Sequence, residues 1–189
     1  PIFKFDFIFM KGFIFTEFLE MVEDQFGLEI TDTIIENSEL PSEGIYTSVG
    51  TYDFNEMVSL LTNLSSEVKM SPNDLLYAFG LYLFDSLGKA HPEIIKSYAS
   101  PIALLNSIED HIHVHVKKLY PDAELPSFTI IEKTDTSLSM IYSSSRGLYS
   151  LAHGLMEKAF THFNSSAEIS YELLKEDGTQ VKFHIVQHG

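Results

Sequence analysis

Residues 141–149 read IYSSSRGLY, and Arg146 is the only arginine among the 12 Lys and Arg residues of the chain. The first five residues are typical of a strand end, where side chains alternate between two faces. Tyr142, Ser144 and Arg146 should therefore share a face, if the strand persists that far. A guanidinium can bind a carboxylate or phosphate through two parallel bonds, which lysine cannot do. The stretch predicts a face that binds a substrate carboxylate, the carboxylates of a cofactor, or a buried Asp or Glu; the alternative is an ordinary exposed strand end.

Two hairpins are predicted around this stretch. SFTIIEK (127–133) and SLSMIYS (137–143) are β-rich runs around a short turn. After a helix at about 148–164, AEISYELLK (167–175) and QVKFHIV (180–186) flank a turn with Asp-Gly at its centre. The pattern indicates four strands, with a helix inserted after the second.

The chain before residue 121 reads as helical. Apolar residues recur at three- and four-residue steps, and Ser71-Pro72 and Ser100-Pro101 are typical helix starts. Helices are expected at about 10–26, 29–37, 53–67, 71–87 and 100–120. The fold class is therefore α+β, with an N-terminal helical subdomain packed on a C-terminal subdomain that carries a four-stranded antiparallel sheet and helices. Residues 1–9 are interpreted as an upstream extension or a cloning remnant, because they lack the apolar run of a signal peptide; a short strand or arm is the alternative.

Composition excludes several classes of partner. The net charge of −15 argues against nucleic acid and against an anionic membrane surface, because both need clustered Lys and Arg. No apolar run reaches the ~18 residues of a membrane-spanning helix. The absence of cysteine excludes disulfides and thiolate metal sites, and it fits a cytoplasmic protein.

Three alternating histidines, His111, His113 and His115, lie in the predicted helix 100–120. In a strand they would share a face and could form the metal site of an enzyme. In a helix, with about 100° per residue, His111 and His115 share one side and are expected to be a solvated pair. His113 then borders the apolar face, where it could be a hydrogen-bonded core residue or a single axial ligand of a haem iron.

Taken together, these features resemble the H-NOX family, the haem-based nitric oxide or oxygen binding domains related to the sensor of soluble guanylate cyclase. The family's Y-x-S-x-R signature stands at 142–146, and His113 lies 29 residues before Tyr142 in DHIHVHVKKLYP. Pro126 follows the histidine by 13 residues, and the family's M-K-G start appears at residues 10–12. The resemblance covers residues 10–189, essentially the whole chain, as a single H-NOX domain.

The resemblance implies a haem b between a distal helical subdomain, about 10–67, and a subdomain of about 68–189 with the haem-ligating helix and the sheet. His113 would be the axial iron ligand, and Pro126 would press on the macrocycle and distort it. The propionates would be bound by Tyr142, Ser144 and Arg146. Some relatives carry a cysteine-rich zinc site, which a chain without cysteine cannot have.

The resemblance also implies which gas is bound. Oxygen-binding relatives carry a distal tyrosine nine residues after the first Tyr of the signature, and here that position is Leu151. The other positions expected to line the distal side are likewise apolar: Ile14, Phe18, Leu83, Leu87 and Leu155. Tyr149 is about 200° round the helix from Leu151 and should face away. We expect a sensor of NO, also binding CO, without enzymatic turnover.

The partner and the alternative functions complete these expectations. The partner would be a histidine kinase or a cyclic-di-GMP enzyme, as is common for stand-alone bacterial members. The alternatives for function are an oxygen-binding or redox-responsive haem sensor, or a metal-dependent enzyme built on the three histidines.

Overall fold

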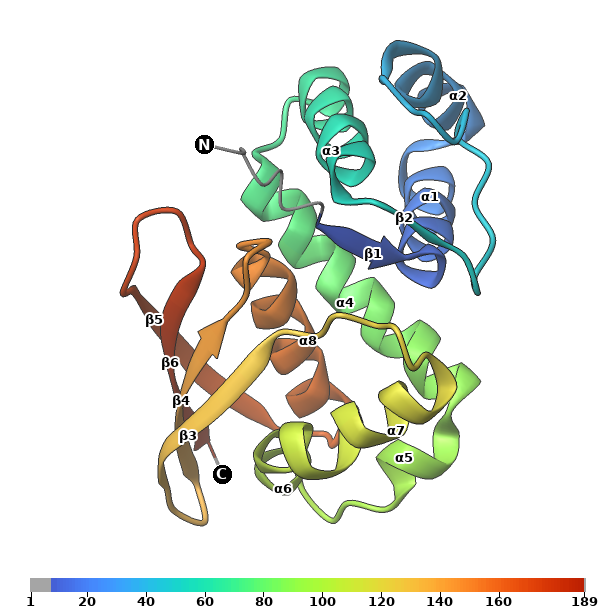
Figure 1. The fold of residues 1–189 in the computed structure, drawn as a ribbon. Helices are drawn as coiled ribbons and strands as arrows, with labels where there is room; N and C mark the ends of the chain where they lie inside the picture. Colours follow the sequence, from blue (N-terminus) through green and yellow to red (C-terminus); the bar gives the residue numbers. More distant parts are fainter. Residues whose placement is uncertain (1–7, 189) are drawn as a thin grey trace, which may run out of the picture. The chain divides into compact units, whose positions relative to one another are not determined.

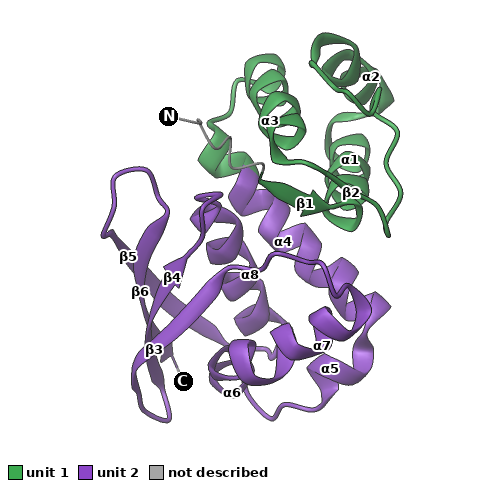
Figure 2. Ribbon diagram, in the orientation of Figure 1, with its two compact units in different colours: residues 1–75 green, residues 76–189 purple. Residues whose placement is uncertain are grey.

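The computed structural model describes residues 8–188, and the chain divides into two compact units between Leu75 and Leu76 (Figure 2). This boundary lies inside a continuous helix, α4 (Pro72–Ala90), whereas the sequence suggested a division near residue 67, before that helix. The expected N-terminal extension, 1–9, falls mostly on residues 1–7, outside the described residues. Phe9, however, opens a short strand.

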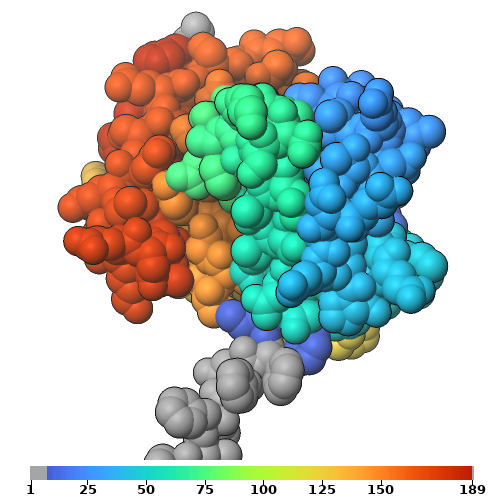
Figure 3. All heavy atoms as spheres, turned by 90° about the horizontal axis from the view of Figure 1, so that it is seen from above, coloured from blue at the N-terminus to red at the C-terminus, as the bar shows by residue number. Residues whose placement is uncertain are grey.

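The first unit is helical, with one short two-stranded antiparallel sheet (Figure 1). Its α1 buries Phe15, Phe18 and Val22, which recur at three- and four-residue steps as the sequence predicted. The two strands were not predicted, because three residues are too few to give an alternating pattern. Helices α2 and α3 pack on each other, and Figure 3 shows their outer surface in blue and green. The elements before α4 are β1 (Phe9–Lys11), α1 (Gly12–Phe26), α2 (Leu28–Asn37), β2 (Thr51–Asp53) and α3 (Phe54–Val68).

The second unit holds the predicted four-stranded antiparallel sheet, in the order β3-β4-β6-β5. Both predicted hairpins and the helix between them are confirmed, and the α+β fold class with them. The central pairing, β4 with β6, joins the two hairpins. The sheet and its helix comprise β3 (Ser127–Lys133), β4 (Ser137–Ser143), α8 (Tyr149–His162), β5 (Ser166–Leu173) and β6 (Gln180–His188).

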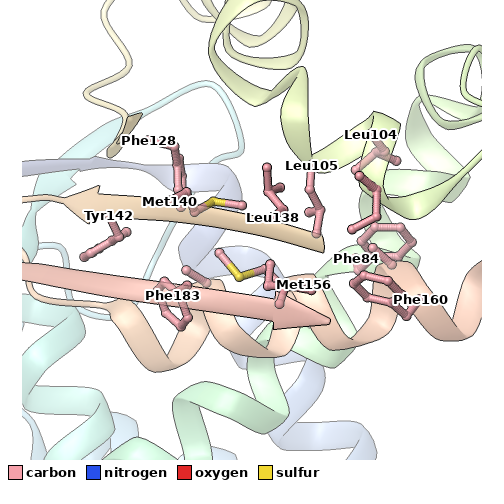
Figure 4. Packing of buried hydrophobic residues seen from close by; sticks show 14 of the residues in the cluster. Phe84, Leu104, Leu105, Phe128, Leu138, Met140, Tyr142, Met156, Phe160 and Phe183 are labelled. Carbon is pink, nitrogen blue, oxygen red and sulfur yellow. The ribbon is translucent and has the colours of Figure 1, made fainter. Parts of the chain in front are cut away.

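One face of this sheet forms the core of the unit (Figure 4). Leu138, Met140 and Tyr142 alternate along β4 with less buried residues, as expected for a strand with one buried face. Phe183 of β6 and Met156 of α8 pack in the same cluster. Tyr142, the first residue of the signature, is therefore anchored in the core.

The prediction of a single helix at 100–120 is wrong in detail. The segment consists of three pieces, α6 (Pro101–Asn106), a π-helical turn η1 (Ile108–Ile112) and α7 (His113–Leu119). The carbonyl of Ser107 accepts hydrogen bonds from the backbone N–H groups of both His111 (3.0 Å) and Ile112 (3.2 Å). The second bond spans five residues, which widens the turn and shifts the helical phase after it. A short helix, α5 (Pro92–Lys96), was also missed.

Helices α4 and α8 approach closely within the second unit because glycines lie at their contact. A Cβ added at Gly154 would lie 2.1 Å from the carbonyl oxygen of Tyr77, and one added at Gly80 would lie 2.3 Å from that of Leu151. Only glycine fits at such a backbone approach. None of the helices in the described part of the chain is both long and apolar enough to cross a membrane.

Candidate functional site

His113 lies at the junction of the π turn and α7, and its side chain is only 16% exposed. Its Nδ1 is 3.2 Å from Oε1 of Glu109. The same oxygen accepts a 2.7 Å hydrogen bond from the backbone N–H of Phe128 at the start of β3. The Phe128 ring lies beside the imidazole, with the ring centroids 6.0 Å apart. Glu109 therefore links the histidine to the sheet and orients its ring.

This arrangement suits a neutral metal-ligating imidazole. Burial lowers the pKa of His113 below its usual value, and the nearby Glu109 carboxylate offsets this only in part. A proton on Nδ1, facing the carboxylate, leaves the lone pair on Nε2. Carboxylates commonly fix the tautomer of metal-bound histidines in this way.

Tyr142, Ser144 and Arg146 come together, but not through a continuous strand. β4 ends at Ser143, and the backbone N–H of Arg146 donates a 3.3 Å hydrogen bond to Oγ of Ser144 in the turn that follows. Burial raises the pKa of Tyr142; hydrogen bonds with the Ser144 side chain and the Leu148 backbone, and the Arg146 charge, oppose that rise. The sequence placed the three side chains on one face only if the strand persisted to residue 146. It does not, because the chain turns at residues 144–147, where the N–H of Gly147 donates to the carbonyl of Ser144.

Gly147 makes this turn possible. Its φ is +63°, in the left-handed region that disfavours side chains, and an added Cβ would lie 2.9 Å from the carbonyl oxygen of Asp177. The turn thus presses against the β5–β6 loop. A second contact with this region is the 2.9 Å hydrogen bond that the N–H of Ser144 donates to the carbonyl of Thr179.

The single arginine already holds a carboxylate. Arg146 is 7% exposed, and its Nη1 lies 3.3 Å from Oε2 of Glu124, while its Nη2 donates to the Glu124 carbonyl. Glu124 itself is 55% exposed. The arginine therefore places one guanidinium nitrogen beside a carboxylate oxygen and the other on a backbone carbonyl, and the carboxylate in this structure is that of a solvent-accessible glutamate.

The other site positions in the second unit lie on three segments. Pro126 is half-buried and directly precedes β3. Leu83 and Leu87 belong to α4, and Leu151 and Leu155 to α8, the helices that cross at Gly80 and Gly154. Tyr149 packs against Tyr171, with ring centroids 5.3 Å apart, and against Gly178.

The remaining distal positions, Ile14 and Phe18, lie on α1 in the first unit, where Phe18 is fully buried.

The family model for haem-NO-binding domains (HNOB) matches residues 11–171. The chain belongs to this family. Members are haem-binding gas-sensor domains, so this H-NOX domain is a sensor and not an enzyme. The alternative hypothesis, a metal-dependent enzyme, requires His111, His113 and His115 to lie in a strand. Residues 111–115 are helical instead.

Solved structures of bacterial H-NOX proteins are similar over nearly the whole chain. An Fe(II) unliganded H-NOX protein from K. algicida is 56% identical with a TM-score of 0.93, covering 95% of this chain and 97% of that one. An H-NOX from Shewanella woodyi in the Fe(II)CO state is 40% identical (TM-score 0.80, 95% of both chains). An H-NOX protein from S. oneidensis in the Fe(II)NO state is 28% identical (TM-score 0.87, 95% and 100%). No curated protein matches the chain significantly.

The side chains of this H-NOX domain fit a haem. A haem needs an axial ligand and a partner for two propionate carboxylates. His113 offers Nε2, since Nδ1 faces Glu109, and one guanidinium nitrogen of Arg146 lies beside a carboxylate oxygen, that of Glu124. Both groups are largely withdrawn from water.

No role was predicted for the residues that support these groups. Glu109 precedes His113 by four residues, the spacing of one helical turn, and that spacing was the available signal. Glu124 lies in a loop, so no periodicity places it beside Arg146.

Of the expected solvated pair, His111 is exposed, whereas the side chain of His115 is only 31% exposed. Nδ1 of His111 is hydrogen-bonded to the hydroxyl of Tyr98. His115 lies instead beside His91 and Glu93 of the α5 region. The two histidines therefore contact different segments, which helical spacing alone could not show.

Proposed function

We propose that this H-NOX domain binds haem b through His113 and senses NO, with CO as a second ligand and without forming a stable oxygen complex. The observation that carries the proposal is the 3.2 Å contact of His113 Nδ1 with Glu109, which leaves Nε2 available for an external ligand. Relatives solved in Fe(II)NO and Fe(II)CO states support the choice of gases.

Haem, when bound, supplies a ferrous iron with an open position for a diatomic gas. His113 would hold the iron, and Glu109 would orient the imidazole and raise its basicity. Arg146 would exchange Glu124 for a propionate, while Tyr142 and Ser144 donate further hydrogen bonds. Pro126, immediately before β3, would press on the macrocycle.

Selection against oxygen would rest on the apolar distal residues. Bound oxygen develops negative charge and is stabilised by a hydrogen-bond donor, whereas NO needs none. Leu83, Leu87, Leu151 and Leu155 offer no side-chain donor. Tyr149, the tyrosine nearest in sequence to Leu151, packs on Tyr171 of β5.

A signal would leave the site through α7. His113 is the first residue of this helix, directly after the π turn, and π turns commonly mark functional positions. A change in ligation at His113 would act on this segment and, through Glu109, on β3. We assign a cytoplasmic histidine kinase or cyclic-di-GMP enzyme as the receiver.

The test is the absorption spectrum of the purified protein, reduced and then exposed separately to NO, CO and air. We expect a haem spectrum that shifts with NO and with CO but shows no persistent oxy form in air. A stable oxy spectrum would favour the alternative, an oxygen-binding sensor. Colourless protein that does not take up added haem would contradict the proposal as a whole.

A further inference from the structure

Two histidines and one glutamate converge between the α5 region and α7, and the proposed haem site uses none of them. One ring nitrogen of each of His91 and His115 and one carboxylate oxygen of Glu93 all lie within 4.8 Å of one another. Glu93 Oε1 is 3.6 Å from Nδ1 of His91 and 3.9 Å from Nε2 of His115. We propose that these three side chains bind a divalent transition-metal ion such as Zn²⁺, with water completing its coordination.

Two of the three distances between these atoms are close to the spacing of metal ligands, and the third, between the two ring nitrogens, is at most 4.8 Å. Zinc binds nitrogen and oxygen at about 2.0–2.2 Å, so tetrahedral ligand atoms lie about 3.4 Å apart. Direct hydrogen bonds would bring the atoms to about 2.7–3.2 Å. The measured 3.6 and 3.9 Å exceed the hydrogen-bond range and lie within about 0.5 Å of the metal-bound spacing. Small side-chain rotations would complete the site.

The ligand set selects the class of ion. Two imidazoles and one carboxylate are the ligands of zinc and related first-row metals, whereas Mg²⁺ and Ca²⁺ prefer oxygen ligands throughout. Three protein ligands leave a position for water. The side chains of His91, His115 and Glu93 are 28%, 31% and 62% exposed, so an ion can enter from solvent.

The backbone holds two of the ligands in a fixed turn. The N–H of His91 donates to the carbonyl of Leu87 at 2.8 Å, and its own carbonyl accepts from Ile94 at 3.1 Å. Pro92 follows directly and restricts the conformation of His91. Glu93 lies in the first turn of α5, so its position relative to His91 is set by this short helix.

The third ligand comes from the helix that carries the proposed iron ligand. His113 and His115 are two residues apart on α7, about 200° round the helix. Accordingly His113 contacts Glu109, whereas His115 lies 5.7 Å, ring to ring, from His91. An ion bound here would join α7 to α5 without occupying the side of α7 that bears His113.

The experiment uses the full chain, purified without an affinity tag. A chelator first removes any metal ion bound to the purified protein. Zinc ions are then titrated by calorimetry, and bound zinc is counted by elemental analysis after dialysis. The variants are His91→Ala, His115→Ala and Glu93→Gln, the last changing one charge at nearly constant shape. His111→Ala is the matched control, since this exposed histidine lies one turn from His115 and outside the cluster.

We expect one zinc ion per chain in the wild type and in His111→Ala, and at least about a tenfold loss of affinity in each of the other three variants. X-ray absorption at the zinc edge should show two imidazole ligands in the wild-type complex. Absence of zinc binding by the wild type, or equal affinity in the wild type, His91→Ala and His115→Ala, would overturn the proposal. Because zinc is counted without reference to gas binding, this outcome is independent of the haem proposal.

Discussion

Glu109 and His113 are four residues apart in sequence, and Oε1 of the first lies 3.2 Å from Nδ1 of the second. The same oxygen accepts the backbone N–H of Phe128, so one carboxylate ties the histidine to the first strand of the sheet. This contact makes Glu109 a positioning residue for the axial ligand, and it leads to the first prediction.

Glu109→Gln should weaken the bond between His113 and iron. The amide keeps an oxygen for the N–H of Phe128 but removes the negative charge beside Nδ1, so the imidazole becomes less basic. Loss of such a supporting carboxylate typically costs about 10- to 100-fold in metal affinity. Resonance Raman spectroscopy should show a lower iron–histidine stretching frequency, and haem should dissociate faster. Asp110→Asn, the same change at the adjacent exposed position, is the control; equal frequencies in both variants would show that Glu109 has no such role.

Arg146→Ala should accelerate haem loss. The substitution leaves a propionate without its charged, bidentate partner, at a cost of about 2 kcal/mol, which corresponds to roughly a 30-fold change in dissociation. Transfer of haem to an excess of an acceptor protein measures the rate. Glu124→Gln removes the carboxylate that the arginine binds in this structure, so haem retention should be unchanged or improved. A wild-type rate in the Tyr142/Ser144/Arg146 triple alanine variant would refute the assignment of the signature to the propionates.

Leu151→Tyr should raise the affinity for oxygen. A phenol at this position could donate a hydrogen bond, and one such bond contributes about 0.5–1.5 kcal/mol, up to roughly tenfold in affinity. Leu151→Phe adds the ring without the hydroxyl and separates hydrogen bonding from bulk. The measurement is the oxygen affinity and autoxidation rate of each reduced variant; identical values for Tyr and Phe would show that the added hydroxyl donates no hydrogen bond to bound oxygen.

Gly154→Ala should destabilise the protein. The new Cβ would lie 2.1 Å from the carbonyl oxygen of Tyr77, a backbone atom, so α4 and α8 must separate. Overpacking of this kind costs about 1–3 kcal/mol, against about 1 kcal/mol regained from helix propensity. Each net kcal/mol lowers Tm by about 2–4 °C in a chain of this size.

Gly88→Ala is the matched control for that substitution. There the added Cβ meets only Cδ1 of Ile95, the end of a flexible side chain, at 2.9 Å. Its Tm should be unchanged or slightly higher. If both variants had the same Tm, close packing at Gly154 would not limit stability.

The sequence was sufficient for much of the fold because local patterns determined most of the elements. The β-rich runs at 127–133 and 137–143 and the Asp-Gly turn at 177–178 predicted both hairpins. Ser-Pro pairs gave the starts of α4 and α6. The π turn at Ile108–Ile112 could not be predicted. Its backbone hydrogen bonds span five residues instead of four, but the spacing of the apolar residues in the sequence is the same as in an α-helix.

The candidate site could be proposed from the sequence only where its residues form a motif. His113, Tyr142 and Arg146 could be proposed from their spacing and residue type. The contacts around them are tertiary, and no periodicity reveals them. Glu124 reaches Arg146 across 22 residues, and Glu93 reaches His115 from a helix too short for a clear pattern.

The central claim is that His113 is the axial ligand of a bound haem, and His113→Gly tests it most directly. We predict that the reduced variant loses the native five-coordinate ferrous spectrum and that added imidazole, which can fill the space left by the side chain, restores it. His111→Gly and His115→Gly should keep the native spectrum without imidazole. Loss of that spectrum in either of these variants, with its retention in His113→Gly, would contradict the account.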